Sequence, residues 1–184
     1  MKILRARDRV AVPWRNGGGL TREVAVHPQG ARLEDFGWRV SIATVERSGP
    51  FSLFPGIDRH LALFEGSMIL ELTGYGMARL SRESGPVVFP GDAPANAKIL
   101  EGPVTDLNVM ARHGVFTARL TLREIEDVFV CAPRATTLVF PLSRAELTDG
   151  DALDVQDAVM AEPGEEVRFA APTECYLAEI FATR

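Results

Sequence analysis

Short apolar runs separated by turn signals follow one another along almost the whole chain. The runs at 38–45, 60–64 and 68–72 are rich in aromatic and β-branched residues, which favour strands. Turn clusters such as Pro55-Gly56-Ile57-Asp58 punctuate these runs, and the turn at Glu65-Gly66-Ser67 is expected to separate the second run from the third. Many short strands with regularly spaced turns predict an all-β sandwich or barrel.

Further strands are expected over most of the remaining sequence. They lie at 2–4, 20–26, 77–80, 87–89, 105–112, 115–122, 128–131, 136–140, 155–160, 166–169 and 175–181. The segment 94–100 is ambiguous, and only 143–147 indicates a helical turn.

A period of two places polar side chains together on particular strand faces. Arg39 and Ser41 share one face of 38–45, whose other face is largely apolar. Asp106 and Asn108 likewise share a face of 105–112. Such a face points either to solvent, which is the commoner case, or into a polar cavity.

Three consecutive glycines, 17–19, precede the strand at 20–26. Because glycine loses more backbone entropy than other residues on folding, a run of three suggests a geometry that Cβ atoms would obstruct. One interpretation is a close approach of backbone N–H groups to an anionic or carbonyl ligand; the other is a structural loop or bulge. A phosphate-binding P-loop is excluded because no Lys-Ser/Thr pair follows the glycines.

Composition narrows the class of protein. The 184 residues are 46% hydrophobic and 24% charged, with a net charge of −5 and no basic stripe. Binding to nucleic acid or to an anionic membrane is therefore not expected. No apolar run is long enough for a membrane helix, and charges scattered through the first residues argue against a signal peptide, so a cytoplasmic protein is expected. Cys131 and Cys175 are expected to be buried reduced thiols, with a disulfide between them as the alternative.

Several motifs resemble those of the HutD/Ves family. These blocks are Trp14-x-Asn16-Gly17-Gly18-Gly19-x-Thr21-x-Glu23, Phe36-x-Trp38-Arg39-x-Ser41-x-Ala43, Gly49-Pro50-Phe51-Ser52-x-Phe54-Pro55-Gly56-x-Asp58-Arg59, Phe89-x-Gly91-Asp92 and Asp106-x-Asn108-x-Met110. They cover 14–112, whereas the last third of the chain fits by length and strand content rather than by motif.

The resemblance implies a cupin-type β-barrel, in particular a bicupin with two β-barrel or sandwich halves. We expect residues 1–112 to form the half that carries the motifs and 113–184 a more degenerate half, with strands exchanged between them. Family members are encoded with histidine-utilisation genes and are thought to act as a governor of that pathway. N-formylglutamate and urocanate are the ligands that the resemblance suggests.

Metal chemistry and nucleophilic catalysis find little support in the residues. Cupin metal sites use an H-x-H pair, a nearby Glu and a later His, but the three histidines here, His27, His60 and His113, are far apart. No G-x-S-x-G elbow or activated cysteine motif is present. No metal, cofactor or catalytic residue is therefore predicted.

Binding of a small carboxylate is the leading hypothesis. Arg39 and Arg59 could clamp a carboxylate through bidentate hydrogen bonds, and Asn16 and Asn108 could bind an amide or formyl group. The full set of expected ligand-binding residues is Asn16, Gly18, Thr21, Glu23, Arg39, Ser41, Arg59, His60, Asp106 and Asn108.

Other interpretations remain open at this stage. Arg59 could pair with Asp58 or Asp92 to hold a turn, and the Arg39 side chain could extend to solvent at a barrel end. A metal-independent isomerase or epimerase could use His60 with Glu23 or Asp106 on a small acid or a sugar derivative. Exposed strand edges are compatible with a homodimer.

Overall fold

The computed structural model describes residues 1–183, in which regular structure is almost entirely β-strand. Two 3₁₀ turns, η1 (Ala6–Asp8) and η2 (Arg82–Ser84), are the exceptions within this range. The predicted all-β class is confirmed. No helix in the described range is long and apolar enough to cross a membrane.

The larger sheet has eight strands and contains every segment that carries a family-like motif. Its hydrogen-bonded order is β2-β3-β4-β9-β6-β7, with β5 paired to β9 and β8 paired to β6. The strands are β2 (Ala11–Pro13), β3 (Gly19–His27), β4 (Trp38–Val45), β5 (Gly49–Pro50), β6 (Ile57–Leu72), β7 (Gly76–Leu80), β8 (Val87–Pro90) and β9 (Ala95–Arg112).

A five-stranded sheet of order β1-β15-β12-β17-β10 and two small ribbons, β11–β16 and β13–β14, complete the fold. The strands are β1 (Lys2–Leu4), β10 (Phe116–Ile125), β11 (Val128–Val130), β12 (Ala135–Pro141), β13 (Ala145–Glu146), β14 (Ala152–Leu153), β15 (Ala158–Ala161), β16 (Glu166–Arg168) and β17 (Thr173–Ala182). The N-terminal strand β1 therefore pairs with β15, far along the chain.

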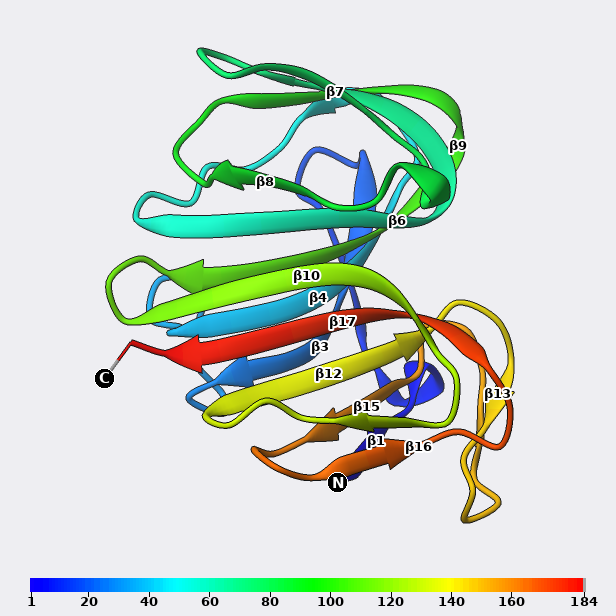
Figure 1. Cartoon of the computed structure of the whole chain (residues 1–184). Coiled ribbons are helices and arrows are strands. Elements are labelled where there is room, and N and C mark those ends of the chain that lie inside the picture. The colour runs from blue at the N-terminus through cyan, green and yellow to red at the C-terminus, as the bar shows by residue number, and fades with distance from the viewer. Residues whose placement is uncertain (184) are drawn as a thin grey trace.

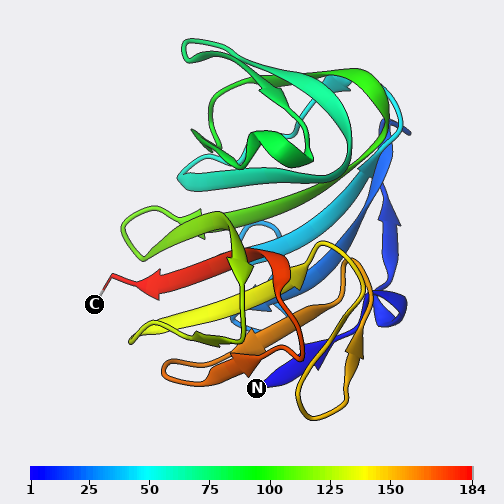
Figure 2. The ribbon, with the colours of Figure 1, turned by 45° about the vertical axis from the view of Figure 1, so that its right-hand side comes forward.

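The two sheets pack face to face, with β10, β17 and β12 in front of β4 and β3 in Figure 1. A shared core fills the space between them, because alternate residues of each strand point inward. Val40 and Ile42 of β4 belong to this core, as do Phe140 of β12 and Tyr176 of β17. Figure 2 shows the same stacking after a rotation of 45°.

Each sheet has a second apolar core on its other face. In the eight-stranded sheet Leu61 and Leu63 of β6 lie in that core together with Met68 and Leu70 of the same strand. Met68 follows Leu63 by five positions, an odd offset, so strict alternation would place the two side chains on opposite faces. Register shifts between Leu63 and Met68, with Gly66 at φ +80°, restore the inward direction.

Three local expectations are corrected by the strand pairing. Segments 60–64 and 68–72 belong to the single strand β6, and 94–100 continues into 105–112 as β9, because β6 and β9 pair along almost their full lengths. Residues 143–147 form no helical turn: they contain β13, which pairs with β14.

Curvature in the larger sheet does not produce a closed barrel. The hydrogen-bonded path runs from β2 to β7 and does not return on itself. The expected closed cupin barrel is therefore not observed in the described part of the chain. The smaller sheet encloses its own outer core, to which Cys175 and Leu177 of β17 contribute.

Candidate functional site

Five side chains from three adjacent strands form a polar layer within the curved larger sheet. They are Arg39 and Ser41 of β4, Arg59 of β6, and Asp106 and Asn108 of β9. Ser41 lies opposite Asn108, while Arg39 and Arg59 both lie opposite Met110, so β9 is flanked by the two arginines. Strand alternation assigns each of these side chains to one face of its strand, and the pairing of β9 with both β4 and β6 brings those faces together.

Arg59 is the most deeply buried cation of this layer, with 4% of its surface exposed. Its guanidinium carbon lies 5.5, 5.3 and 5.0 Å from the ring centroids of Phe51, Phe54 and Phe89, within cation–π range. Nη1 donates to the Ser52 carbonyl at 3.2 Å, whereas Nε is buried and has no protein partner. Burial lowers the pKa of Arg59 to about 10, which leaves it charged at neutral pH.

Asp106 and Asn108 supply buried oxygens on the same face of the sheet as this cation. Burial raises the pKa of Asp106 to about 7, against the opposing effect of the Arg59 charge. Asn108 Oδ1 is buried and has no hydrogen-bond partner in the described structure. The centre of the layer thus holds a guanidinium with a free donor, a carboxyl that titrates near neutrality and a free amide acceptor.

Arg39 lies at the more exposed side of the layer and is paired. Its Nε donates to Glu23 Oε2 at 2.9 Å, and its Nη1 donates to Ser41 Oγ at 3.3 Å. The register of β3 against β4 shifts between Glu23 and Ala25, and up to that shift Glu23 is aligned with Ser41. Arg39 is therefore held in place by Glu23, and its side chain remains 12% exposed.

The alternative in which Arg59 pairs with Asp58 or Asp92 is wrong, since neither carboxylate forms a salt bridge with it. Asp58 instead contacts His113 Nδ1 at 3.2 Å. The nearest partners of Arg59 are a carbonyl and three aromatic rings. No carboxylate lies within salt-bridge distance of it in the described structure, and the Asp106 carboxyl acts on its charge only from farther away.

The glycine-rich loop is held by its own hydrogen bonds and by close contact with β4. Asn16 Oδ1 accepts from the N–H of Gly18, and a Cβ on Gly19 would lie 2.4 Å from the Thr44 carbonyl oxygen. Trp14 Nε1 donates to Thr21 Oγ1 at 2.7 Å, so the Thr21 hydroxyl is also engaged within the loop. These contacts support the interpretation of the glycines as a tight structural loop. Thr21 is aligned with Ala43, which is aligned with Asp106, so the Thr21 side chain lies on the same face of the sheet as the polar layer. Trp14 meets the Phe51 ring, which covers Arg59, edge-on at 6.2 Å.

His60 is not brought to the layer. It neighbours Arg59 on β6, and successive residues of a strand point to opposite faces. Its Nδ1 is buried without a partner, and burial lowers its pKa. The suggested acid–base pairs of His60 with Glu23 or Asp106 are therefore not assembled. Within residues 1–183 no three His, Cys, Asp or Glu side chains gather as metal ligands would.

The aromatic residues around Arg59 were not among the expected site residues. Phe51, Ser52 and Phe54 come from the segment after β5, and Phe89 comes from β8. The Gly-Pro-Phe-Ser-x-Phe-Pro-Gly block contains Phe51, Ser52 and Phe54, but the sequence of a loop does not reveal which cation its aromatic residues cover.

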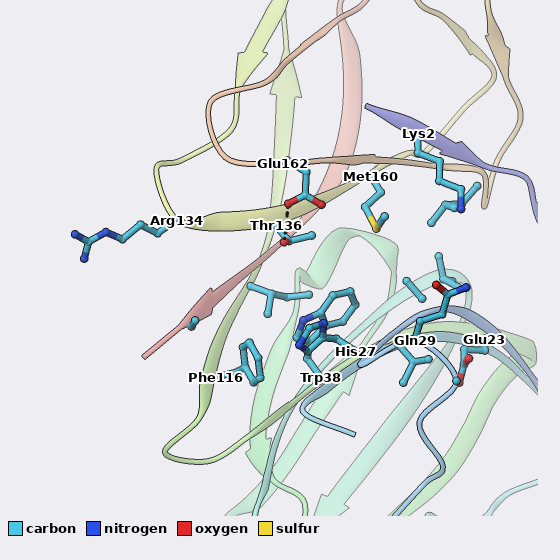
Figure 3. Close-up of a pocket in the computed structure, with 17 residues that line it drawn as sticks. Lys2, Glu23, His27, Gln29, Trp38, Phe116, Arg134, Thr136, Met160 and Glu162 are labelled. Carbon is cyan, nitrogen blue, oxygen red and sulfur yellow. Dashed lines mark hydrogen bonds between the residues drawn. The ribbon is translucent and has the colours of Figure 1, made fainter. Parts of the chain in front are cut away.

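A separate cavity of about 740 Å³ lies between the two sheets. Figure 3 shows His27, Trp38 and Phe116 on one side and Thr136, Met160 and Glu162 on the other. Neither Arg39 nor Arg59 lines it, and of the expected ligand-binding residues only Glu23 does. The polar layer and the inter-sheet cavity are distinct sites.

Comparison with known sequences gives consistent relatives. The chain is 35% identical over 120 residues to an uncharacterised 21.2 kDa protein from the hutC 3′ region of Pseudomonas putida, which covers 65% of this chain and 63% of that protein. It is 37% identical over 133 residues to the protein Ves of Citrobacter koseri, covering 72% and 68% of the two chains.

Comparison with solved structures agrees over the full length. A conserved protein of unknown function from Pseudomonas aeruginosa PAO1 matches with a TM-score of 0.83 and 31% identity, covering 98% of both chains. HutD from Pseudomonas fluorescens SBW25, described in a formate condition, matches with a TM-score of 0.82 and 29% identity over 100% and 99% of the chains.

Bacillus subtilis oxalate decarboxylase matches at a TM-score of 0.65 and 10% identity over 98% of this chain and 76% of that one, which shows a cupin-like all-β fold and nothing about activity. The HutD family model matches residues 6–178. With that match and the motifs that surround the polar layer, the chain belongs to the HutD family.

Proposed function

We propose that the polar layer binds a small carboxylate and that the protein acts, without catalysing a reaction, as a cytoplasmic governor of histidine utilisation. N-formylglutamate and urocanate are the proposed ligands. The observation that carries this proposal is the buried Arg59 guanidinium, which has no salt-bridge partner in the described structure and has an unpaired Nε. A buried charge without a partner is costly, and such groups are characteristic of binding sites.

The neighbouring groups favour a carboxylate that also carries an N–H. A ligand carboxylate next to Arg59 would supply the missing counter-ion through charge-assisted hydrogen bonds. Asn108 Oδ1, which has no partner, would accept from an amide or imidazole N–H. A formamide N–H in N-formylglutamate and a ring N–H in urocanate both meet this requirement.

Binding would involve the segment 51–55. Its aromatic rings and the Ser52 carbonyl currently cover the guanidinium. A ligand carboxylate would take the place of the Ser52 carbonyl at Nη1, so this segment is expected to shift when the ligand binds.

The test is calorimetric titration of formate, N-formylglutamate and urocanate into the wild-type protein and into Arg59→Met. Methionine preserves much of the volume while removing the charge, so we expect at least a tenfold loss of affinity, or about 1.4 kcal/mol. Arg32→Met, which removes an exposed arginine, is the matched control. Undiminished binding by Arg59→Met, or no binding of any of these acids by the wild type, would overturn the proposal.

The regulatory part has its own test. Replacing the chromosomal gene with the Arg59→Met allele should reproduce the effect of a deletion on transcription of the histidine-utilisation genes. If a deletion leaves that transcription unchanged during growth on histidine, the governor role is wrong even where ligand binding is intact.

A second candidate function follows from Asp106. A buried carboxyl with a pKa near 7 is suited to general acid–base catalysis at neutral pH. A metal-independent isomerase or epimerase acting on a small acid or sugar derivative would use Asp106 alone, since His60 lies on the other face of its strand. NMR of the protein incubated with N-formylglutamate, urocanate or nucleotide-sugars distinguishes the two: product signals support the enzyme, whereas shift changes without product support the binder.

We also infer that each half is a cupin unit, 1–112 and 113–184, with β1 exchanged into the second, and that the chain forms a homodimer. The pairing of β1 with β15 and the exposed side chains of Val10 and Val12 at the edge strand β2 support these two inferences. Light scattering of the purified protein tests the dimer.

A further inference from the structure

The inter-sheet cavity has features of a small-molecule site that is independent of the polar layer. Its volume of about 740 Å³ lies within the roughly 300–1,000 Å³ of typical ligand pockets. It is built from both sheets, with His27 and Trp38 from the larger sheet and Thr136, Met160 and Glu162 from the side of the smaller one. Side chains from two sheets that converge on one space can contact opposite faces of a ligand.

An aromatic platform forms one side of this cavity. The rings of His27 and Trp38 are stacked, with centroids 5.8 Å apart and an interplanar angle of 10°. Phe116 meets the His27 ring edge-on at 5.5 Å. Stacked rings at the wall of an open cavity offer a flat surface on which another planar ring can stack.

Glu162 faces this platform from the opposite side. Figure 3 shows its carboxylate directed toward the His27–Trp38 stack, while the Arg134 side chain points away from the cavity. The only side-chain hydrogen bond to Glu162 within the described structure is a long one, 3.4 Å, from the Thr136 hydroxyl. The second carboxylate of the lining, Glu23, is already paired with Arg39. Glu162 is therefore available to a ligand that donates hydrogen bonds.

We propose that the inter-sheet cavity binds a planar aromatic cation, with its ring on the His27–Trp38 stack and its N–H donors on Glu162. The thioether of Met160 lies in the same lining and suits this occupant, because sulfur makes favourable contacts at ring edges. A negatively charged aromatic ligand would meet Glu162 unfavourably. The two proposed sites thus differ in the charge that they select: anions at the polar layer and, beside Glu162 in a lining that also contains Lys2, cations in the inter-sheet cavity.

Tryptophan fluorescence gives a direct test with benzamidine as the probe. The chain has two tryptophans, so Trp14→Phe leaves Trp38 as the sole reporter. Benzamidine is expected to quench Trp38 emission saturably, whereas benzoate, with the same ring and the opposite charge, and acetamidine, with the same charge and no ring, are not. Circular dichroism checks that Trp14→Phe remains folded.

Two substitutions assign the contacts. In the Trp14→Phe background, Glu162→Gln should weaken benzamidine binding about tenfold, the usual scale for loss of a charge-assisted pair. Glu174→Gln, which changes an exposed glutamate outside this lining, should have no effect. His27→Ala should weaken binding as well, whereas His113→Ala, an exposed histidine outside the lining, should not.

Several outcomes would overturn the proposal. These are absence of saturable quenching, equal affinity of Glu162→Gln, and benzoate binding that matches benzamidine. Trp38 emission could also change with protein concentration before benzamidine is added. That result would indicate that a second copy of the chain, and not a small molecule, occupies the cavity. Arg59→Met should bind benzamidine normally, so failure here is distinguishable from failure of carboxylate binding at the polar layer.

Discussion

Arg59 and Glu179 occupy comparable positions in the two halves of the molecule. Each is a charged side chain with 4% exposure, on the face of a central strand that points away from the other sheet. In the second half the Glu179 carboxylate accepts from Arg119 Nε at 2.8 Å and lies 2.7 Å from Arg119 Nη2. In the first half Arg59 donates to a backbone carbonyl and has no carboxylate in salt-bridge range.

The difference indicates that the Arg119–Glu179 pair is structural and that Arg59 is available to bind a ligand. In the Arg119–Glu179 pair two guanidinium nitrogens contact one carboxylate oxygen, Oε2, so both charges are satisfied within the protein. The Arg59 guanidinium, with its unpaired Nε, and Asn108, with its unpaired Oδ1, leave hydrogen-bonding capacity for another molecule. Unsatisfied buried groups lower stability, so they persist where binding requires them.

Breaking the pair in the second half should have the largest effect on stability. Arg119→Met leaves the Glu179 carboxylate buried without its partner, at an expected cost of about 2 kcal/mol after allowing for the exposure of Arg119. Urea denaturation measures this loss, and carboxylate binding by the folded variant should be normal. The double variant Arg119→Met/Glu179→Gln, which removes the isolated charge, should recover part of the stability.

Arg59→Met, the corresponding change in the first half, should have the opposite effects: little change in stability and a large loss of carboxylate affinity. Arg59→Met replaces an uncompensated buried cation by an apolar side chain among three phenylalanines, so stability should change by less than about 1 kcal/mol. Carboxylate affinity should nevertheless fall at least tenfold. If Arg59→Met were as destabilised as Arg119→Met, Arg59 would be a structural residue and the contrast between the halves would fail.

Asp106 should make stability and binding depend on pH. Its pKa is about 7 in the folded protein and 3.8 in an ordinary environment. Between these values the folded state holds a proton that the unfolded state has released, so this group lowers stability as pH rises from about 4 to 7. Above pH 7 the ionised Asp106 also opposes a ligand carboxylate at Arg59.

Asp106→Asn should therefore flatten both profiles. Urea midpoints at pH 5 and pH 8, and formate titrations at the same two pH values, provide the measurements. A wild-type formate affinity that is equal at the two pH values would show that Asp106 does not face the bound anion.

The smallest effect expected concerns the thiols of the second half. Cys131 and Cys175 are free and buried, so the suggested disulfide is not formed. Burial raises the pKa of Cys175 to about 12, which suppresses its reactive thiolate. Labelling with a thiol reagent should be slow in native protein and fast in guanidinium chloride. Rapid labelling of the native protein would indicate that the thiol reagent can reach the interior of the second half without unfolding.

Much of the polar layer could be predicted from strand alternation. Arg39, Ser41, Asp106 and Asn108 lie on the faces that a period of two assigns to them. The same rule places His60, the residue after Arg59, on the opposite face of its strand, and would have excluded it from the expected ligand-binding residues. The positions of Asn16, Gly18 and Thr21 depended on loop hydrogen bonds, which the pattern of apolar residues does not contain.

The sequence by itself determined an all-β protein of the HutD family, because side-chain periodicity and turn residues act locally along the chain. Only the tertiary structure decided which charges are paired. Glu23 with Arg39 and Arg119 with Glu179 meet across strands whose register depends on bulges and on distant partners. Only the tertiary structure created the inter-sheet cavity, since its walls come from sheets that are far apart in the chain and are brought together by burial of the shared core.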